Sequence, residues 1–311
     1  MRGTPGLVLI LIVLGAGWGI TQPLAKIAVS GGYQPLGLIF WQMVIVAVVL
    51  GVIVLLRGRA LPMTARHIKL YTIIALIGTV LPGAASYRAI FHLPSGVVSI
   101  LLSLVPMIAF PVALMLGNDR FSWFRLLGLL TGLVGVLLLT VPDASLPEPD
   151  LAIWVLIALL APVCYACEGN YVARWGTEGL DPIQTLCGGS IIGMIISLPL
   201  AVFSGQWISP LPPWGAADGA LLASSVIHAG VYSSYVWLVG RAGPSFAVQV
   251  SYLVTGFGVL WAMALLGEAY SGFVWVAMGL MLIGIFLVQP RENSALVPAP
   301  SLGNDSPDDQ V

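Results

Sequence analysis

Long apolar runs, separated by short polar, proline or glycine breaks, dominate the pattern along the chain. A helix rises about 1.5 Å per residue, so crossing a bilayer core of about 30 Å takes about 20 apolar residues. Ten runs approach or exceed this length, and we expect one transmembrane helix in each. The expected helices are Gly6–Ala28, Pro35–Leu56, Leu70–Phe91, Pro94–Leu116, Trp123–Val141, Leu151–Ala173, Ile183–Phe203, Gly219–Val239, Ser245–Leu266 and Gly272–Val288.

The two ends of the chain need separate interpretation. Met1 and Arg2 before an apolar run resemble a signal peptide, but that run is longer than a signal-peptide core and nine further runs follow it. We therefore interpret it as the first transmembrane helix. Residues 291–311 have no apolar periodicity and include Pro298, Pro300 and Pro307, which predicts a disordered cytoplasmic tail.

Composition excludes a water-soluble domain. Hydrophobic residues make up 59% of the chain and charged residues only 8%, whereas soluble domains carry about 25% charge. The three cysteines, Cys164, Cys167 and Cys187, all fall in apolar runs, so we expect small buried side chains rather than disulfides. The segment Cys164-x-x-Cys167-Glu168 has metal-ligand residue types but lacks further convergent ligands, and we predict no metal and no cofactor.

The placement of lysine and arginine tests the count of ten spans, because cytoplasmic loops are enriched in these residues. With the amino terminus in the cytoplasm, ten of the twelve basic residues fall on the inner side, and only Lys26 and Arg88 lie toward the outer face. The connection at residues 142–150 is acidic and falls outside. We expect a multi-pass protein of the cell (inner) membrane with both termini cytoplasmic.

The last five spans repeat signals of the first five, which predicts an inverted repeat. The matched pairs are Gly117-Asn118 with Gly267-Glu268, Leu93-Pro94-Ser95 with Gly243-Pro244-Ser245, and Trp18 before Lys26 with Tyr165 before Arg174. Because five is an odd number, the second copy must enter the membrane from the opposite side, an arrangement typical of secondary transporters. We predict a first repeat at 1–142, a periplasmic linker at 143–150 and a second repeat at 151–290.

Several features together resemble the EamA-type members of the drug/metabolite transporter superfamily over about residues 6–289. These are Trp18-Gly19 and Lys26 in the first helix, Pro106 midway through the fourth, Gly267-Glu268 before the tenth, and Gly279 and Gly284 within it. Asn118 and Thr255 depart from the repeated pattern. The resemblance implies a cavity between the repeats, lined by the first, third, fourth, sixth, eighth and ninth helices, and export of metabolites, amino acids or drugs.

Two ionisable residues, Glu168 and His228, lie inside predicted spans, where charge is costly and marks a pathway. Either side chain could take up and release a proton during transport. The alternatives are that Glu168 reaches cytoplasmic water beside Arg174 and that His228 hydrogen-bonds a helix backbone. The candidate substrate-binding residues are Trp18, Gln22, Gln42, Tyr87, Arg88, Ser99, Tyr165, Glu168, His228, Tyr232, Gln249 and Tyr252.

Some of these residues have a second interpretation. Tyrosines can anchor at the membrane interface, the Ser99 hydroxyl suits close helix packing, and Arg88 can either extend to water or bind a substrate carboxylate. The sequence predicts a secondary transporter, an exporter working by alternating access on a small-molecule substrate, with protons as the candidate coupling ion. An intramembrane enzyme or a channel is the alternative. We expect no nucleic-acid partner, and a monomer or homodimer in the bilayer.

Overall fold

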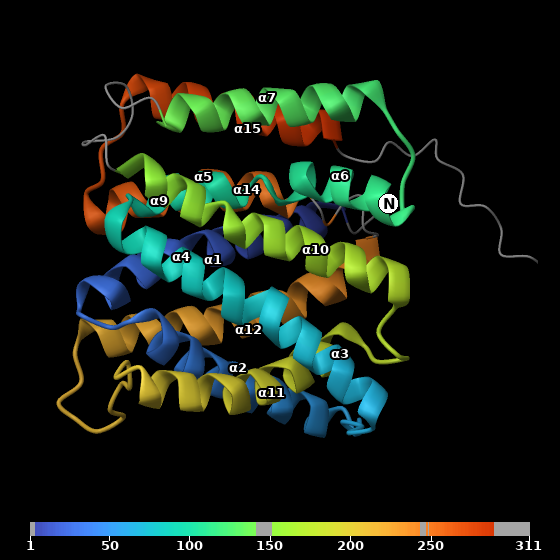
Figure 1. The fold of residues 1–311 in the computed structure, drawn as a ribbon, viewed down its shortest axis with the longest axis vertical. Coiled ribbons are helices and arrows are strands. Elements are labelled where there is room, and N and C mark those ends of the chain that lie inside the picture. Colours follow the sequence, from blue (N-terminus) through green and yellow to red (C-terminus); the bar gives the residue numbers. More distant parts are fainter. Residues whose placement is uncertain (1–3, 141–150, 243–246, 248, 289–311) are drawn as a thin grey trace, which may run out of the picture.

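The computed structural model describes residues 4–140, 151–242, 247 and 249–288, and the elements assigned in these ranges are helices lying roughly parallel to one another (Figure 1). They are α1 (Thr4–Ser30), α2 (Pro35–Leu56), α3 (Ala65–Ala75), the π-helix η1 (Leu76–Val80), α4 (Leu81–His92), α5 (Ser95–Leu102), α6 (Val105–Leu116), α7 (Trp123–Thr140), α9 (Ala152–Ala158), α10 (Leu160–Trp175), α11 (Pro182–Phe203), α12 (Ala216–Ala242), α14 (Val250–Leu266) and α15 (Gly272–Val288).

The ten expected spans are confirmed within the described residues, each as one helix or as consecutive helical segments. Seven are long and apolar enough to cross a membrane, and three shorter apolar helices complete the set. The third span begins at Ala65 rather than at Leu70, because the polar turn before Leu70 is already helical. The predicted linker at 143–150 and tail at 291–311 lie outside the described residues.

Three of the spans predicted as continuous helices are segmented a few residues before a proline, and the ninth has a turn at Gln249 between helical Ala247 and α14. The third contains η1 before Pro82, the fourth is interrupted at Ser103 and Leu104 before Pro106, and the sixth is interrupted at Leu159 before Pro162. A proline has no amide hydrogen to donate to the carbonyl four residues earlier, and its ring crowds that carbonyl. The helical hydrogen bonds therefore rearrange at these points.

The first span of each repeat packs against helices of the other repeat, and the second and fifth spans of the two repeats pack in pairs. The second spans of the repeats, α2 and α11, pack on each other, as do the fifth spans, α7 and α15. The first span α1 packs on α12 and α14, while its counterpart α10 packs on α4 and α6. The fourth and ninth spans also end alike, with Gly117 and Gly267 in the left-handed conformation at φ 70° and 65°. The inverted five-helix repeats are thus confirmed.

Glycines allow the close approach of α7 and α15 at one edge of the bundle (Figure 1). A Cβ atom added to Gly128 would lie 2.7 Å from the carbonyl oxygen of Gly284, closer than such atoms approach. A Cβ atom on Gly135 would lie 3.1 Å from the carbonyl oxygen of Ala277. These glycines therefore serve packing within the bundle.

The connections gather at two ends of the bundle. Residues 31–34, 204–215 and 267–271 lie at one end, which we call the outer end after the predicted orientation (Figure 1). The start of α1 and residues 57–64 and 176–181 lie at the opposite, inner end. The split agrees with the alternation expected from the spans, while the side that faces the cytoplasm stays a prediction.

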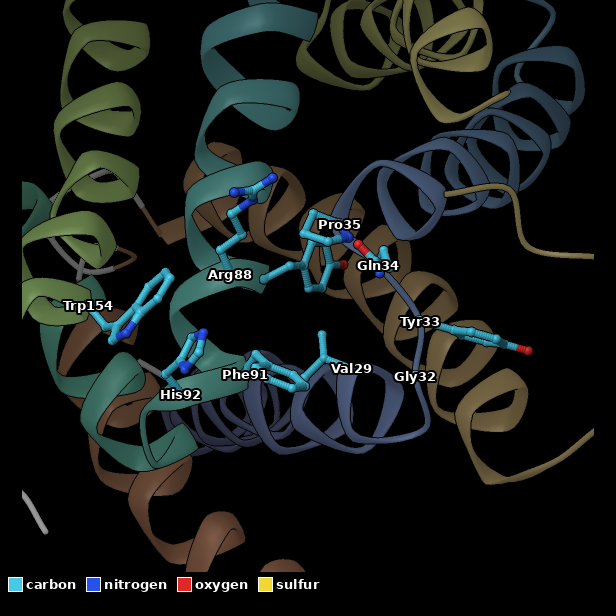
Figure 2. Close-up of a pocket in the computed structure, with 10 residues that line it drawn as sticks. Val29, Gly32, Tyr33, Gln34, Pro35, Arg88, Phe91, His92 and Trp154 are labelled. Atoms are coloured by element: carbon cyan, nitrogen blue, oxygen red, sulfur yellow. The ribbon is translucent and has the colours of Figure 1, made fainter. Parts of the chain in front are cut away.

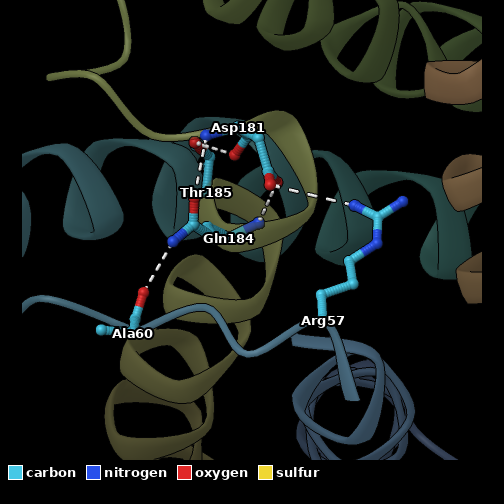
Figure 3. A network of polar contacts seen from close by, with 5 residues as sticks. All are labelled: Arg57, Ala60, Asp181, Gln184 and Thr185. Carbon is cyan, nitrogen blue, oxygen red and sulfur yellow. Dashed lines mark hydrogen bonds and ion pairs between the residues drawn. The ribbon is translucent and has the colours of Figure 1, made fainter. Parts of the chain in front are cut away.

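Side-chain bonds to backbone tie the α2 and α11 pair together at both ends. At the inner end, Asp181 and Gln184 form a capping box that begins α11, and Gln184 Nε2 donates to the carbonyl of Ala60 at 2.6 Å (Figure 3). At the outer end, Gln206 Oε1 accepts from the amide of Leu36 at 2.9 Å. The Gln184–Ala60 and Gln206–Leu36 hydrogen bonds each join one repeat to the other.

Candidate functional site

A hydrogen bond joins the two repeats at the middle of the bundle. Trp18 Nε1, on α1, donates to His228 Nδ1, on α12, at 3.3 Å. Tyr235 packs beside the Trp18 ring with centroids 5.3 Å apart, and the Tyr232 ring lies parallel to His228 at 6.5 Å. The spacing of His228, Tyr232 and Tyr235 along α12 puts all three on one face. The aromatic face of α12 therefore meets Trp18.

This bond sets the protonation state of the imidazole. An indole nitrogen can only donate, so Nδ1 of His228 must be the unprotonated, accepting nitrogen. The neutral ring then carries its hydrogen on Nε2. Protonation of Nδ1 would place two donors against each other and break this hydrogen bond, while α1 still packs on α12.

Glu168 lies on α10 against the π-helix η1. A Cβ atom added to Gly78 of η1 would lie 2.5 Å from Glu168 Oε1 and 2.9 Å from Oε2, so only a glycine leaves room for the carboxyl group. Tyr165 lies three residues before Glu168 on α10, which puts both residues on the same side of that helix. It makes no ion pair with Arg174 among the described residues.

Tyr87 and Gln42 extend this polar group toward the outer end. The Tyr87 hydroxyl, on α4, donates to Gln42 Oε1, on α2, at 2.8 Å. The helix α4, which carries Tyr87, packs on α10, which carries Tyr165. We call the polar and aromatic residues within the spans the central group: Gln42, Tyr87, Tyr165, Glu168, Tyr232, His228 and Trp18. It draws on both repeats.

The other sequence-predicted residues lie apart from this group or differ from it in exposure. Ser99 is buried at 1% exposure, donates to the carbonyl of Ser95, and packs against Gly258, as its packing interpretation predicts. The Tyr252 hydroxyl is buried with no hydrogen-bond partner among the described residues. Gln249 is exposed just before α14, and Gln22 is half-buried on α1.

Sequence reasoning missed a polar cluster at the outer end. Lys26 Nζ donates to the carbonyls of Ile90, Phe91 and Leu93 at 2.7 to 3.1 Å, which caps the end of α4. Glu268 accepts from the amide of Ser95 at 2.8 Å and from that of Gly96 at 3.2 Å, which caps the start of α5. Opposite charges thus stabilise opposite helix ends at the turn between the third and fourth spans.

Tyr270 belongs to the same cluster and donates to Glu268. Burial, and then the hydrogen bond to Glu268, raise the pKa of Tyr270 well above its usual value. The Gly-Glu signal before the tenth helix was visible in the sequence, but its partners on another helix were not. Glu268 and its partners fix the turn between the third and fourth spans. The central group is therefore the candidate transport site.

No group of three His, Cys, Asp or Glu side chains within the described ranges is placed to hold a metal ion. Cys164, Cys167 and Cys187 are free thiols. The central group consists of a carboxyl, an imidazole, an indole, phenols and an amide. Such a set can hydrogen-bond a small polar molecule and stack against its apolar part.

Ten spans in inverted repeats, with polar side chains from both repeats at mid-depth, define a multi-pass membrane protein of the transporter class. The EamA-like transporter family matches residues 5–141 and 152–289, so the chain belongs to this family. The two matched segments correspond to the two structural repeats.

Relatives and a solved structure agree with this assignment. The uncharacterized inner membrane transporter YedA of Escherichia coli (strain K12) is 24% identical over 276 residues, 87% of this chain and 86% of its own. A probable terminal-alkyne amino-acid exporter of Streptantibioticus cattleyicolor is 22% identical over 88% of this chain and 90% of its own. A crystal structure 19% identical in sequence shares the fold with a TM-score of 0.61, covering 91% of this chain and 96% of that one. The chain thus belongs to a family of membrane transporters, and its apolar helices fit a multi-pass membrane protein.

Proposed function

We propose that this protein is a secondary exporter of small organic molecules that works by alternating access of one repeat against the other. The observation that carries the proposal is the Trp18 to His228 hydrogen bond, which crosses the repeat interface at mid-depth. A substrate that competes for either partner would loosen one repeat from the other. Binding and conformational change would then be coupled through one contact.

We further propose that Glu168 carries the coupling proton. Its carboxyl group has no ionic partner in the described residues, and Gly78 holds it against the backbone of η1. A carboxylate in such a place favours uptake of a proton or of a cationic substrate group. His228 is the weaker candidate, because its Nδ1 is already occupied as an acceptor.

The substrate class follows from the side chains of the central group. Indole and phenol rings favour flat or apolar bodies, while Glu168, His228 and Gln42 favour amino, hydroxyl or amide groups. Amino acids and their analogues combine both. The amino-acid exporter of Streptantibioticus cattleyicolor supports this class and the outward direction.

A growth screen tests the function. Cells that overexpress the chain are challenged with toxic amino-acid analogues and with amphipathic drugs, and we expect resistance to at least one compound. That compound is then used for counterflow in liposomes, where saturable exchange is expected. Conductance proportional to voltage would instead indicate a channel, and chemical conversion of the compound an enzyme.

The proton step has its own test. With Glu168→Gln, we expect uptake driven by a pH gradient to be lost while exchange of labelled for unlabelled compound persists, because a glutamine binds substrate but cannot carry a proton. Exposed Glu178, at the inner end, provides the matched control as Glu178→Gln. Gradient-driven uptake that survives in Glu168→Gln would exclude Glu168 as the proton carrier.

A further inference from the structure

A cavity lies at the outer end of the bundle, and Tyr87 of the central group is among its lining residues. It has a volume of about 440 Å³, which is within the range of small-molecule sites. Three elements form it: the connection from α1 to α2, the last turns of α4, and α9 of the second repeat (Figure 2). The lining residues are Val29, Gly32, Tyr33, Gln34, Pro35, Tyr87, Arg88, Phe91, His92 and Trp154.

Arg88 gives this outer pocket a positive charge. Its side chain is exposed, and neither a hydrogen bond nor an ion pair occupies its guanidinium group among the described residues. The lining residues that the structure describes include no carboxylate. Lys26, the other basic residue at this end, is held by three carbonyls of the last turn of α4 and the residue after it. Arg88 is therefore the cation left for a ligand.

Aromatic rings form an apolar wall in the same pocket. His92 stacks on Trp154 with centroids 3.7 Å apart and planes 11° from parallel, which joins α4 to α9 (Figure 2). Phe91 packs edge-on against His92 at 5.0 Å. A guanidinium group on the rim and stacked rings below it suit a molecule with one anionic end and an apolar body.

Tyr87 links this pocket to the central group. Tyr87 lines the pocket, while its hydroxyl donates to Gln42 of the central group at 2.8 Å. The outer pocket and the central group therefore share Tyr87.

We propose that the outer pocket is an exit site that binds the carboxylate of the transported molecule through Arg88 and its apolar part on Phe91 and Trp154. That the occupant is the transported molecule rests on the proposed export function. The same anionic chemistry is found in phosphatidylglycerol headgroups, and the test separates the two sources.

The test uses the full chain in phosphatidylcholine nanodiscs and titration calorimetry with two probes, N-acetyl-phenylalanine and its uncharged amide. We expect the acid to bind about tenfold more tightly than the amide, because a charge-assisted hydrogen bond to an arginine is lost in the amide. Arg88→Gln should remove this preference, and Arg88→Lys should keep part of it. Trp154→Leu should weaken both probes by a similar factor.

Arg241→Gln is the matched control, since Arg241 is exposed at the inner end and should leave the preference intact. The proposal is overturned if neither probe binds saturably, or if the preference for the acid survives in Arg88→Gln. It is also overturned if discs containing phosphatidylglycerol displace the acid from the wild type, because the pocket then holds a lipid headgroup. Failure of counterflow alongside Arg88-dependent binding would refute export and leave the anion pocket standing.

Discussion

Gly78→Ala is the sharpest test of the central group, because the added methyl would meet the Glu168 carboxyl directly. The new Cβ would lie 2.5 Å from Oε1, 2.8 Å from Cδ and 2.9 Å from Oε2. All three atoms belong to the end of a flexible side chain, so the carboxyl group can move away while the backbone stays in place. The substitution therefore acts on one functional group.

The structure sets the size of the effect. Ordinary contact begins at 3.4 Å, so the carboxyl group must move by about 1 Å, and a displacement of about 1 Å in a catalytic or binding group can lower a rate about 100-fold. Stability should change little, because alanine favours a helix over glycine by about 0.5 to 1 kcal/mol, which offsets part of the crowding. We expect transport to fall and folding to persist.

The assay is counterflow of the compound identified by the growth screen, together with the thermal unfolding midpoint in detergent. Gly169→Ala is the matched control: Gly169 follows Glu168 on α10, and its Cβ atom would meet nothing within 4 Å. Wild-type transport by Gly78→Ala would refute the placement of Glu168 in the transport site. A large loss of stability would show that the crowding falls on the backbone instead.

Three further predictions address separate contacts. Trp18→Phe keeps a ring but removes the donor to His228, and we expect substrate affinity in counterflow to rise about fivefold, the size of one hydrogen bond, because substrate then reaches His228 without breaking that bond. Glu268→Gln weakens the cap of α5 and should lower the free energy of unfolding by about 1 to 2 kcal/mol, measured by denaturant titration. Burial of Tyr33, its hydrogen bond to Asp218 and the negative charge of Asp218 raise the pKa of Tyr33 from 10.0 to about 12. The stability that the Tyr33–Asp218 contact adds is complete below pH about 10 and declines toward pH 12. In Tyr33→Phe, the thermal unfolding midpoint should lack this decline.

Each of these predictions has a contradicting result. Unchanged affinity in Trp18→Phe would remove the repeat-joining bond from the mechanism. An unfolding free energy equal to the wild type in Glu268→Gln would mean that the cap adds no net stability. A decline of the same size in Tyr33→Phe would assign the alkaline loss to other tyrosines.

The sequence predicted the number of spans and the inversion of the repeats because both depend on properties local to each run. Apolar length determines whether a segment crosses the membrane, and loop signals such as Gly117 and Gly267 recur wherever a helix ends in the left-handed conformation. The breaks before Pro82 and Pro162 were missed, because hydropathy remains high across a helix whose hydrogen bonds are interrupted.

The sequence singled out the residues of the central group, but it did not show which of them contact each other. Glu168, His228, Trp18 and Tyr232 stood out as polar or aromatic residues within spans, but only the packing of α1 on α12 brings Trp18 to His228. Gly78 carried no signal by itself. The proline four residues later was the one local indication that the backbone beside Glu168 would be irregular.

Stiffness is distributed unevenly between equivalent parts of the two repeats. The third and sixth spans pack together and are both segmented, whereas their counterparts α12 and α1 pack together and are continuous within the described residues, even though α1 contains Pro23. A helix with an interrupted hydrogen-bond ladder bends more easily than an intact one. The two symmetry-related groups of helices therefore differ in how easily they bend. A force that acts equally on both groups bends mainly the group that contains η1.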